Sequence, residues 1–471
     1  TNKIIDELIE EYFKKYNLVL KQDNGSNRDN LFRKKFELFI YLVLLDYYFR
    51  IQNKIIENIA HKLREIYTIY SSFRFINKNF IHLITESIIG NVFGYKFNLN
   101  EGNHLEVHLF NYSGIGRSLL EQWHQIKKEL GMNGPSIVML SGTSYAPKSA
   151  HYHIEEVPSF ILKSEKQEGE IKQFINIKYD NLRKPIKISG ISDRNFKKEK
   201  INELTDLLYN DFKYEIDHWM GLGDNRKILI IVNSYEQCRI VGDSLRYREL
   251  SYRVLSRNNE LDLDEINASS IEELPENNPV DILVAPLSII SRGYNILKHN
   301  GDSYFGSVFF LIRPYTVPGD LAYNYRILNS AVIPKLLNYK KQGYPLEKAV
   351  EKTRRFAFGL ESQFNNQKFW KYLSDEEKEI LSWFTFIPIK QTIGRTQRNG
   401  CSCRVFYCDG SFVSEDNGEL TTQSSMLKAW EENLININEG IGKLLYGEFL
   451  NGLSFAINDF EDSNENEEVF Y

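Results

Sequence analysis

Four short, mostly apolar runs in the second half of the chain constrain its fold more than any other feature. They are Lys227 to Val232, Val280 to Ala285, Gly306 to Ile312 and Cys403 to Cys408. Continuous apolar runs of this length are typical of strands buried on both faces, as in a parallel sheet covered by helices. Helical periodicity over Asn202 to Met220 provides one such covering helix. The sequence therefore predicts an α/β fold built on a parallel sheet.

An earlier stretch repeats this pattern. Gly116 to Leu130 has the apolar spacing of an amphipathic helix, and Ser136 to Leu140 follows as a predicted buried strand. The strand leads into three hydroxyl residues, Ser141, Thr143 and Ser144. Because ligands bind at the carboxyl ends of the strands in such sheets, these side chains are expected to lie near a ligand.

The rest of the chain divides by periodicity and composition. Ile4 to Val92 is predicted to be helical, His104 to Tyr112 to be a strand, and Ser425 to Phe449 to be a helix. The acidic end, Asn458 to Glu468, is predicted to be frayed. We therefore expect four parts, which are residues 1–130 (a mostly helical region), 131–195 (a predicted strand and a β-rich connector), 196–460 (a second α/β domain with a helical insert at 319–390) and 461–471 (an acidic tail).

Composition is that of an ordinary globular protein. The 471 residues are enough for two or three domains, and the net charge of −5 argues against a broadly basic nucleic-acid coat without excluding a local basic groove. Four cysteines do not make a disulfide framework in a chain of this length, so a reducing cytoplasm is expected. The most apolar run, Leu38 to Leu45, is too short to span a bilayer. We expect a cytoplasmic protein with no membrane partner.

Residues 391–400 read Gln-Thr-Ile-Gly-Arg-Thr-Gln-Arg-Asn-Gly and place two arginines three positions apart. An arginine carries a permanent charge on a planar fork that binds phosphate oxygens in pairs. Residues three apart on a helix share a face, so Arg395 and Arg398 are expected to point into one cleft. The segment is therefore a candidate phosphate-binding site.

The pattern Gln-x-x-Gly-Arg-x-x-Arg resembles the sixth conserved motif of superfamily 2 helicases and translocases, the DEAD/DEAH-like proteins. Three loops resemble motifs III, IV and V of that family, in the same order: Ser-Gly-Thr-Ser at 141–144, Asn-Ser-Tyr at 233–235 and Ser-Arg-Gly-Tyr-Asn at 291–295. The resemblance covers about residues 136–410 and implies the C-terminal portion of such an enzyme. Residues 1–130 would then be an arch-like insertion and part of the end of a first motor lobe, 131–195 the rest of that end, and 196–460 a RecA-like second motor lobe. The Ile, Asn and Lys-rich composition fits a large bacterial or anti-phage defence helicase.

The resemblance implies roles for individual residues. Gln391, Arg395 and Arg398 would face the triphosphate of ATP as catalytic residues, the arginines acting as arginine fingers. The implied cofactor-binding residues are Arg292, Gly293, Asn295 and Gly394, with Asn295 near the ribose. The implied nucleic-acid contacts are Ser234 and Ser288, and the residues that couple the nucleotide to the other lobe are Ser141, Thr143 and Ser144.

Two motifs that a complete motor needs are not found. The sequence has no Gly-x-x-x-x-Gly-Lys-Ser/Thr loop for phosphate binding, and Gly114 to Ser118 lacks both its spacing and its lysine. Asp375 to Glu377 imitates the acidic Mg²⁺-binding motif, but we interpret it as a helix start because no apolar strand precedes it. We therefore expect the missing motifs upstream of Thr1, so that ATP and Mg²⁺ bind only the full-length protein and this chain alone has negligible ATPase activity. The expected partners are the missing N-terminal motor lobe and nucleic acid, DNA in preference to RNA.

Other hypotheses stay open at this point. The chain could be a non-catalytic, degenerate helicase-like module that binds a partner, in which case Arg395 and Arg398 would lie in salt bridges. A nuclease subunit is a third class, but no Pro-Asp…Glu-x-Lys cluster supports it. The large helical region before the segment that resembles motif III also resembles the arch region of the iron–sulphur helicases. The four cysteines that bind the cluster in that family would have to lie upstream, because no cysteine here precedes Cys238. The Cys-x-Cys-x4-Cys spacing after residue 400 fits no standard zinc site, so no metal ligands are predicted.

Overall fold

The computed structural model of the chain describes most of its second half and parts of its first. The described residues are 40–41, 43–44, 47–48, 51, 87–89, 92–99, 105–112, 123–125, 131–147, 149, 152–154, 158–162, 169–258, 261–291, 293–314, 321–365, 370–414, 420–437 and 439–468. The chain divides into two compact units, Thr1–Leu83 and Ile84–Tyr471. In the first unit the described residues are helical, and most of the predicted helical stretch from Ile4 to Val92 lies outside the described residues.

The second unit is built around a seven-stranded sheet in which every pair of neighbouring strands is parallel. The strand order is β3-β9-β8-β4-β7-β5-β6. The strands are β3 (Ile171–Ile175), β4 (Lys227–Val232), β5 (Tyr252–Ser256), β6 (Glu265–Asn267), β7 (Ile282–Pro286), β8 (Phe305–Phe310) and β9 (Cys403–Tyr407). The predicted α/β fold with a parallel sheet is confirmed, and each of the four apolar runs forms a strand of this sheet.

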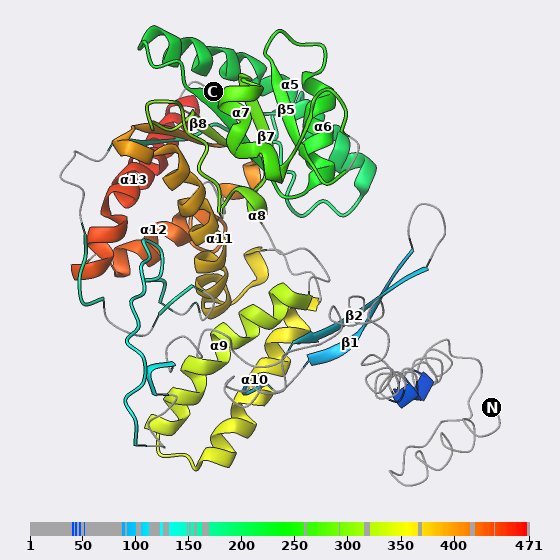
Figure 1. Cartoon of the computed structure of the whole chain (residues 1–471), viewed down its shortest axis with the longest axis vertical. Coiled ribbons are helices and arrows are strands. Elements are labelled where there is room, and N and C mark those ends of the chain that lie inside the picture. The colour runs from blue at the N-terminus through cyan, green and yellow to red at the C-terminus, as the bar shows by residue number, and fades with distance from the viewer. Residues whose placement is uncertain are drawn as a thin grey trace. The chain divides into compact units, whose positions relative to one another are not determined.

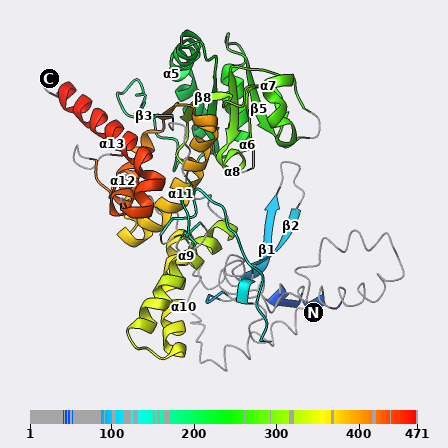
Figure 2. The same cartoon turned by 60° about the vertical axis from the view of Figure 1, so that its left-hand side comes forward.

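Helices cover both faces of the sheet. One face packs against α5 (Arg194–Gly221) and α6 (Tyr235–Leu245), and the other packs against α11 (Asp375–Thr396), α12 (Met426–Asn436) and α13 (Gly440–Glu468) (Figures 1 and 2). Alternate side chains of β4 enter the two cores. Ile228 and Ile230 lie with α5 and α6, whereas Leu229 and Ile231 lie with the other helices. A central strand buried on both faces is what a covered parallel sheet requires.

Smaller elements complete the unit. The short helices α7 (Leu274–Asn277) and α8 (Leu287–Ile290) lie on either side of β7 in the chain, and α9 (Leu321–Lys341) runs beside α10 (Leu346–Asn365) (Figure 2). Strands β1 (Val92–Leu99) and β2 (Leu105–Tyr112) form an antiparallel hairpin, which confirms the strand predicted near His104. Among the helices in the described ranges, none combines the length and the apolar character needed to cross a bilayer.

The strand β3 joins the sheet from a region that the sequence analysis places in a first lobe and a connector. Ile171 of β3 lies opposite Cys403 of β9, so β3 is the edge strand of the same sheet as the apolar runs. Its mixed apolar and polar sequence suits an edge position, where one face of the strand is less covered. The sheet therefore reaches back to residue 171, well before the predicted lobe boundary at 195.

The predicted buried strand at residues 136–140 is wrong. These residues are not in a strand, and the side chains of Val138 and Leu140 are 84% and 85% exposed. A strand needs a neighbour that accepts its backbone hydrogen bonds, and the described residues supply none to this run. The helix predicted just before it falls outside the described residues, except for a 3-10 turn at Trp123–Gln125.

The end of the chain also differs from the prediction. The single helix predicted from Ser425 to Phe449 is two helices, α12 and α13, and α13 continues through the acidic stretch to Glu468. Leu453 and Ile457 of α13 are fully buried in the core. Once such an anchored helix has formed, adding further residues is easy even where they are polar, so the stretch that we expected to fray is helical.

A buried polar network fixes α5 on the sheet. The Glu215 carboxylate lies 2.9 Å from the Nε of Arg404 in β9 and accepts a 2.6 Å hydrogen bond from the Ser307 hydroxyl in β8. Ser307 in turn accepts a 2.7 Å hydrogen bond from the Trp219 indole. A Cβ on Gly306 would lie 2.4 Å from that indole, so only glycine lets the ring pack on the strand.

A second buried carboxylate, Asp409, ties the carboxyl ends of β8 and β9 to the loop before α5. Its two oxygens accept hydrogen bonds from the backbone amides of Ile188 (3.0 Å), Ser189 (2.9 Å), Arg313 (3.1 Å) and Ser411 (2.9 Å). The side chain is fully buried. One carboxylate thus satisfies four amides from three separate segments, which a buried position requires.

Candidate functional site

Helix α11 carries most of the arginine motif. It begins with a capping box, in which the side chains of Ser374 and Glu377 accept hydrogen bonds from each other's backbone amides. The interpretation of Asp375 to Glu377 as a helix start is therefore confirmed. The helix ends between the two arginines, because Arg395 lies in its last turn and Arg398 begins a separate 3-10 turn. The two arginines therefore do not share one continuous helical face.

The two arginines nevertheless interact electrostatically. Burial and the charge of Arg398 lower the pKa of Arg395, while the charge of Glu272 opposes that effect. The Nε of Arg395 is buried and has no hydrogen-bond partner among the described residues. Within the same part of the chain, neither guanidinium forms an ion pair. A half-buried arginine beside an exposed one of the same charge favours the binding of an anion.

The structure brings the start of the arginine motif against the hydroxyl loop at 141–144. The Nε2 of Gln391 donates a 3.0 Å hydrogen bond to the Oγ1 of Thr143. The Oε1 of Gln391 is buried and accepts no hydrogen bond from the described residues. The arginine motif and the hydroxyl loop at 141–144 are therefore in direct contact. The Oε1 of Gln391 stays available as a buried acceptor.

The loop that carries Thr143 is anchored on the helices of the same unit. Ala146 is fully buried in the core, and the backbone carbonyl of Tyr145 accepts a 2.8 Å hydrogen bond from the hydroxyl of Tyr446 in α13. The ring centroid of Tyr152 lies 6.0 Å from that of Phe384 in α11. These contacts hold Thr143 in place against α11.

The two other hydroxyl residues of this loop are less involved. The Ser141 hydroxyl accepts a 3.2 Å hydrogen bond from the Thr143 amide and is exposed. Ser144 is half-buried, and its carbonyl accepts a 2.9 Å hydrogen bond from the amide of Ile154. Of the three predicted coupling residues, only Thr143 contacts the arginine motif through an observed side-chain hydrogen bond.

The loop after α8 lies near the arginines through Glu272. The amide of Asn295 donates a 2.5 Å hydrogen bond to the carboxylate of Glu272, whose charge also acts on Arg395. Gly293 has a φ of +88°, which is a left-handed conformation that favours glycine, and it is exposed. Arg292 lies outside the described residues. The Glu272 carboxylate therefore contacts Asn295 directly and acts on Arg395 through its charge.

Glu272 is not among the site residues predicted from the sequence, because it lies in an acidic stretch, Glu260 to Asn278, whose pattern is that of a solvated loop or helix face. The only signal was charge, and a surface carboxylate near an active site has the same sequence pattern as one on any exposed loop. Glu272 lies in a 3-10 turn, Ala268–Glu273, that directly follows β6, and its charge acts on Arg395.

Ser234 and Ser288 lie in a second region. They follow β4 and β7, which are neighbours in the sheet, so both lie at its carboxyl edge. The Ser234 hydroxyl caps α6 by accepting a 3.3 Å hydrogen bond from the Gln237 amide, and its own proton is left to donate. Ser288 is exposed on α8. The predicted site residues thus divide into a group around the end of α11 and a group at the carboxyl edge.

Gly394 lies in the last two turns of α11, and a Cβ built on it meets nothing within 4 Å. Alanine is favoured over glycine in a helix by roughly 0.5–1 kcal/mol. We therefore expect Gly394→Ala to raise the free energy of unfolding by roughly that amount in urea denaturation. Gly359→Ala in α10, where a Cβ also meets nothing within 4 Å, is the matched control. A loss of stability at Gly394 alone would contradict the open space seen beside it.

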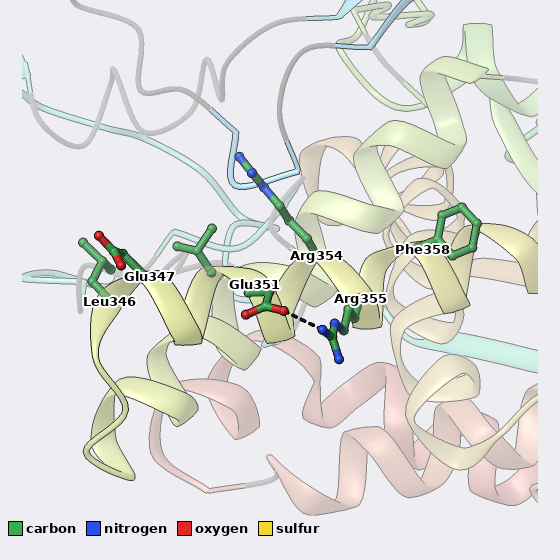
Figure 3. Close-up of a pocket in the computed structure, with 7 residues that line it drawn as sticks. Leu346, Glu347, Glu351, Arg354, Arg355 and Phe358 are labelled. Carbon is green, nitrogen blue, oxygen red and sulfur yellow. Dashed lines mark hydrogen bonds and ion pairs between the residues drawn. The ribbon is translucent and has the colours of Figure 1, made fainter. Parts of the chain in front are cut away.

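Other candidate sites carry less chemistry. A hollow of about 710 Å³ along α10 is lined by Leu346, Glu347, Val350, Glu351, Arg354, Arg355 and Phe358, and it includes none of the predicted site residues (Figure 3). Its Glu351 and Arg355 pair with each other at 2.5 Å. Among the residues that the structure describes, no three His, Cys, Asp or Glu side chains are grouped so that they could hold a metal ion.

Comparison with known proteins does not place this chain in a group. It matches no known protein family, and no functionally described protein is significantly similar to it.

Proposed function

We propose that this chain supplies the second motor lobe of an ATP-dependent nucleic-acid helicase or translocase. The observation that carries the proposal is the hydrogen bond from Gln391 to Thr143, which joins the segments resembling motifs VI and III across 248 positions of sequence. In the family that these motifs resemble, the first senses the triphosphate and the second couples it to the other lobe. A parallel α/β sheet covered on both faces is the kind of domain that the proposal needs.

Arg395 and Arg398 are the proposed phosphate-binding residues. An anion between them would relieve their mutual repulsion and give the buried Nε of Arg395 an acceptor. In other NTPases such an arginine accelerates phosphoryl transfer by about 10³-fold or more. No phosphate-cradling loop occurs in the 471 residues. Another lobe would therefore hold the triphosphate, and these two side chains would complete its binding site.

Gln391 and Thr143 are the proposed sensor. The free Oε1 of Gln391 lies in the same helix as Arg395, one turn earlier, and its Nε2 is held by Thr143. A change at the arginines that shifts α11 would stretch or break this hydrogen bond. The loop at 141–144 would then register whether the triphosphate is present.

The proposed nucleic-acid contacts at Ser234 and Ser288 are tested by binding of a single-stranded oligonucleotide, measured by fluorescence anisotropy. A carboxylate in place of the exposed Ser288 hydroxyl replaces a hydrogen-bond donor by a charge that repels phosphate. We expect Ser288→Asp to weaken binding by roughly tenfold or more at low salt. Ser463→Asp on the exposed end of α13 is the control and should bind like the unmodified protein. Equal affinities for all three proteins would contradict the assignment of the carboxyl edge.

A second candidate is a non-catalytic module with the fold of a motor lobe, which the missing phosphate-cradling loop favours. Such a module would be expected to neutralise Arg395 and Arg398 internally by salt bridges. The described residues contain no salt bridge to either arginine, and this favours the motor lobe.

A further inference from the structure

Arg257 and Tyr235 form a stacked pair at the carboxyl edge of the sheet. Arg257 directly follows β5 and is exposed, whereas Tyr235 begins α6 and is half-buried against the core. The guanidinium carbon of Arg257 lies over the Tyr235 ring, 4.6 Å from its centroid. Among the described residues, the guanidinium forms no ion pair and no hydrogen bond. Its donors and its outer face are therefore available to a ligand.

The topology of the sheet places this pair beside the predicted nucleic-acid contacts. Strand β7 lies between β4 and β5, so Ser288, which follows β7, lies between Ser234 and Arg257 along one edge. The neighbouring carboxylates are engaged or remote from this edge. Glu236 pairs with Arg194 at 2.6 Å, and Asp264 precedes β6, which puts it toward the opposite edge of a parallel sheet.

We propose that Arg257, supported by Tyr235, is a stacking platform for one base of a single-stranded nucleic acid whose backbone passes Ser234 and Ser288. A guanidinium plane stacks on a base as an aromatic ring does, and such contacts recur in single-strand binding because every base offers a π face. The tyrosine beneath Arg257 orders the side chain before binding, which lowers the entropy lost when a base is bound. The inference rests on the proposed nucleic-acid function and deepens it.

A platform differs from a simple phosphate contact in what it recognises. A phosphate contact needs only positive charge, so lysine would replace Arg257 with little loss. A stacking contact needs the planar guanidinium and a base, so lysine would not replace it and a strand without bases would not use it. The two interpretations therefore separate when both the protein and the nucleic acid are varied.

The experiment measures anisotropy of two labelled oligonucleotides of equal length, one of thymidines and one of abasic sites, with the whole chain. Arg257→Ala is expected to weaken thymidine binding by roughly tenfold and abasic binding much less. Arg257→Lys is expected to restore the abasic strand but not the thymidine strand. Arg246→Ala, whose exposed side chain pairs with Asp264, is the matched control and should change neither affinity.

Three results would overturn the inference, and they are distinguishable. If Arg257→Ala weakens both strands equally and lysine restores both, Arg257 contacts phosphate and the platform is wrong. If Ser288→Asp weakens thymidine binding and Arg257→Ala does not, the nucleic-acid site stands and the platform alone is wrong. If the unmodified chain binds neither strand, the proposed nucleic-acid function fails and the platform fails with it.

Discussion

Replacing Asp409 by alanine is expected to lower the free energy of unfolding by about 4 kcal/mol or more, among the largest effects of any single substitution. The reason is the number of groups it serves. Its carboxylate accepts four backbone amides, from Ile188, Ser189, Arg313 and Ser411. Each amide left buried without a partner costs about 1–3 kcal/mol.

Urea denaturation followed by circular dichroism measures the effect. Asp409→Asn keeps one carbonyl acceptor and should fall between the native protein and Asp409→Ala. Asp206→Ala, which removes a half-exposed aspartate that pairs with Arg248, is the control and should change stability by less than about 0.5 kcal/mol. A loss of less than about 1 kcal/mol for Asp409→Ala would show that water or a shifted loop satisfies the four amides.

The second large effect is expected at Glu215. This carboxylate is 1% exposed and is the counter-ion of Arg404, whose side chain is 16% exposed. Glu215→Gln leaves the arginine charge largely buried without a partner, so we expect a loss of about 3–5 kcal/mol in the same urea assay. The hydrogen bond that the carboxylate accepts from Ser307 is also weakened, which adds to the loss.

A double variant tests the cause of that loss. Arg404→Met removes the charge that Glu215→Gln leaves unpaired, so the double variant is expected to recover part of the stability lost by Glu215→Gln alone. If the loss of stability in the double variant equals the sum of the losses in the two single variants, the two side chains do not act as a pair. Arg226→Met is not a suitable control, because Arg226 is itself buried and paired with Asp224 at 2.6 Å.

The sequence predicts the central strands well, because a strand that is buried on both faces consists of consecutive apolar residues. Ile228 to Val232 are apolar without interruption, since β4 has cores on both faces, and β7 and β8 share this property. The run at 136–140 is also mostly apolar, yet it is exposed. An apolar run does not indicate whether a partner strand exists, so the sequence alone could not separate this run from a true strand. Edge strand β3 is the opposite case, because it has a partner strand that the sequence does not reveal. That partner is β9, in which Cys403 lies opposite Ile171, and the residues of β3 do not indicate the pairing.

The site is only partly predictable for the same reason. The types and order of Gln391, Arg395 and Arg398 indicate phosphate chemistry from their side chains alone. Their surroundings come from the fold, because Thr143 reaches Gln391 and Glu272 acts on Arg395 only after the sheet has formed. The end of α11 between the two arginines likewise follows from the turn that leads into β9.

The proposed function requires Arg395 and Arg398 to bind the phosphates of a triphosphate, and phosphorus NMR of inorganic triphosphate tests this directly. Line broadening detects even weak binding to a protein of this size. We expect the unmodified chain and Arg355→Ala, a control on the exposed face of α10, to broaden the signals. We expect Arg395→Ala with Arg398→Ala to abolish the broadening, since charge-assisted hydrogen bonds contribute about 1.5–3 kcal/mol each. Broadening that is as strong with the double variant as with the unmodified chain would contradict the proposed function.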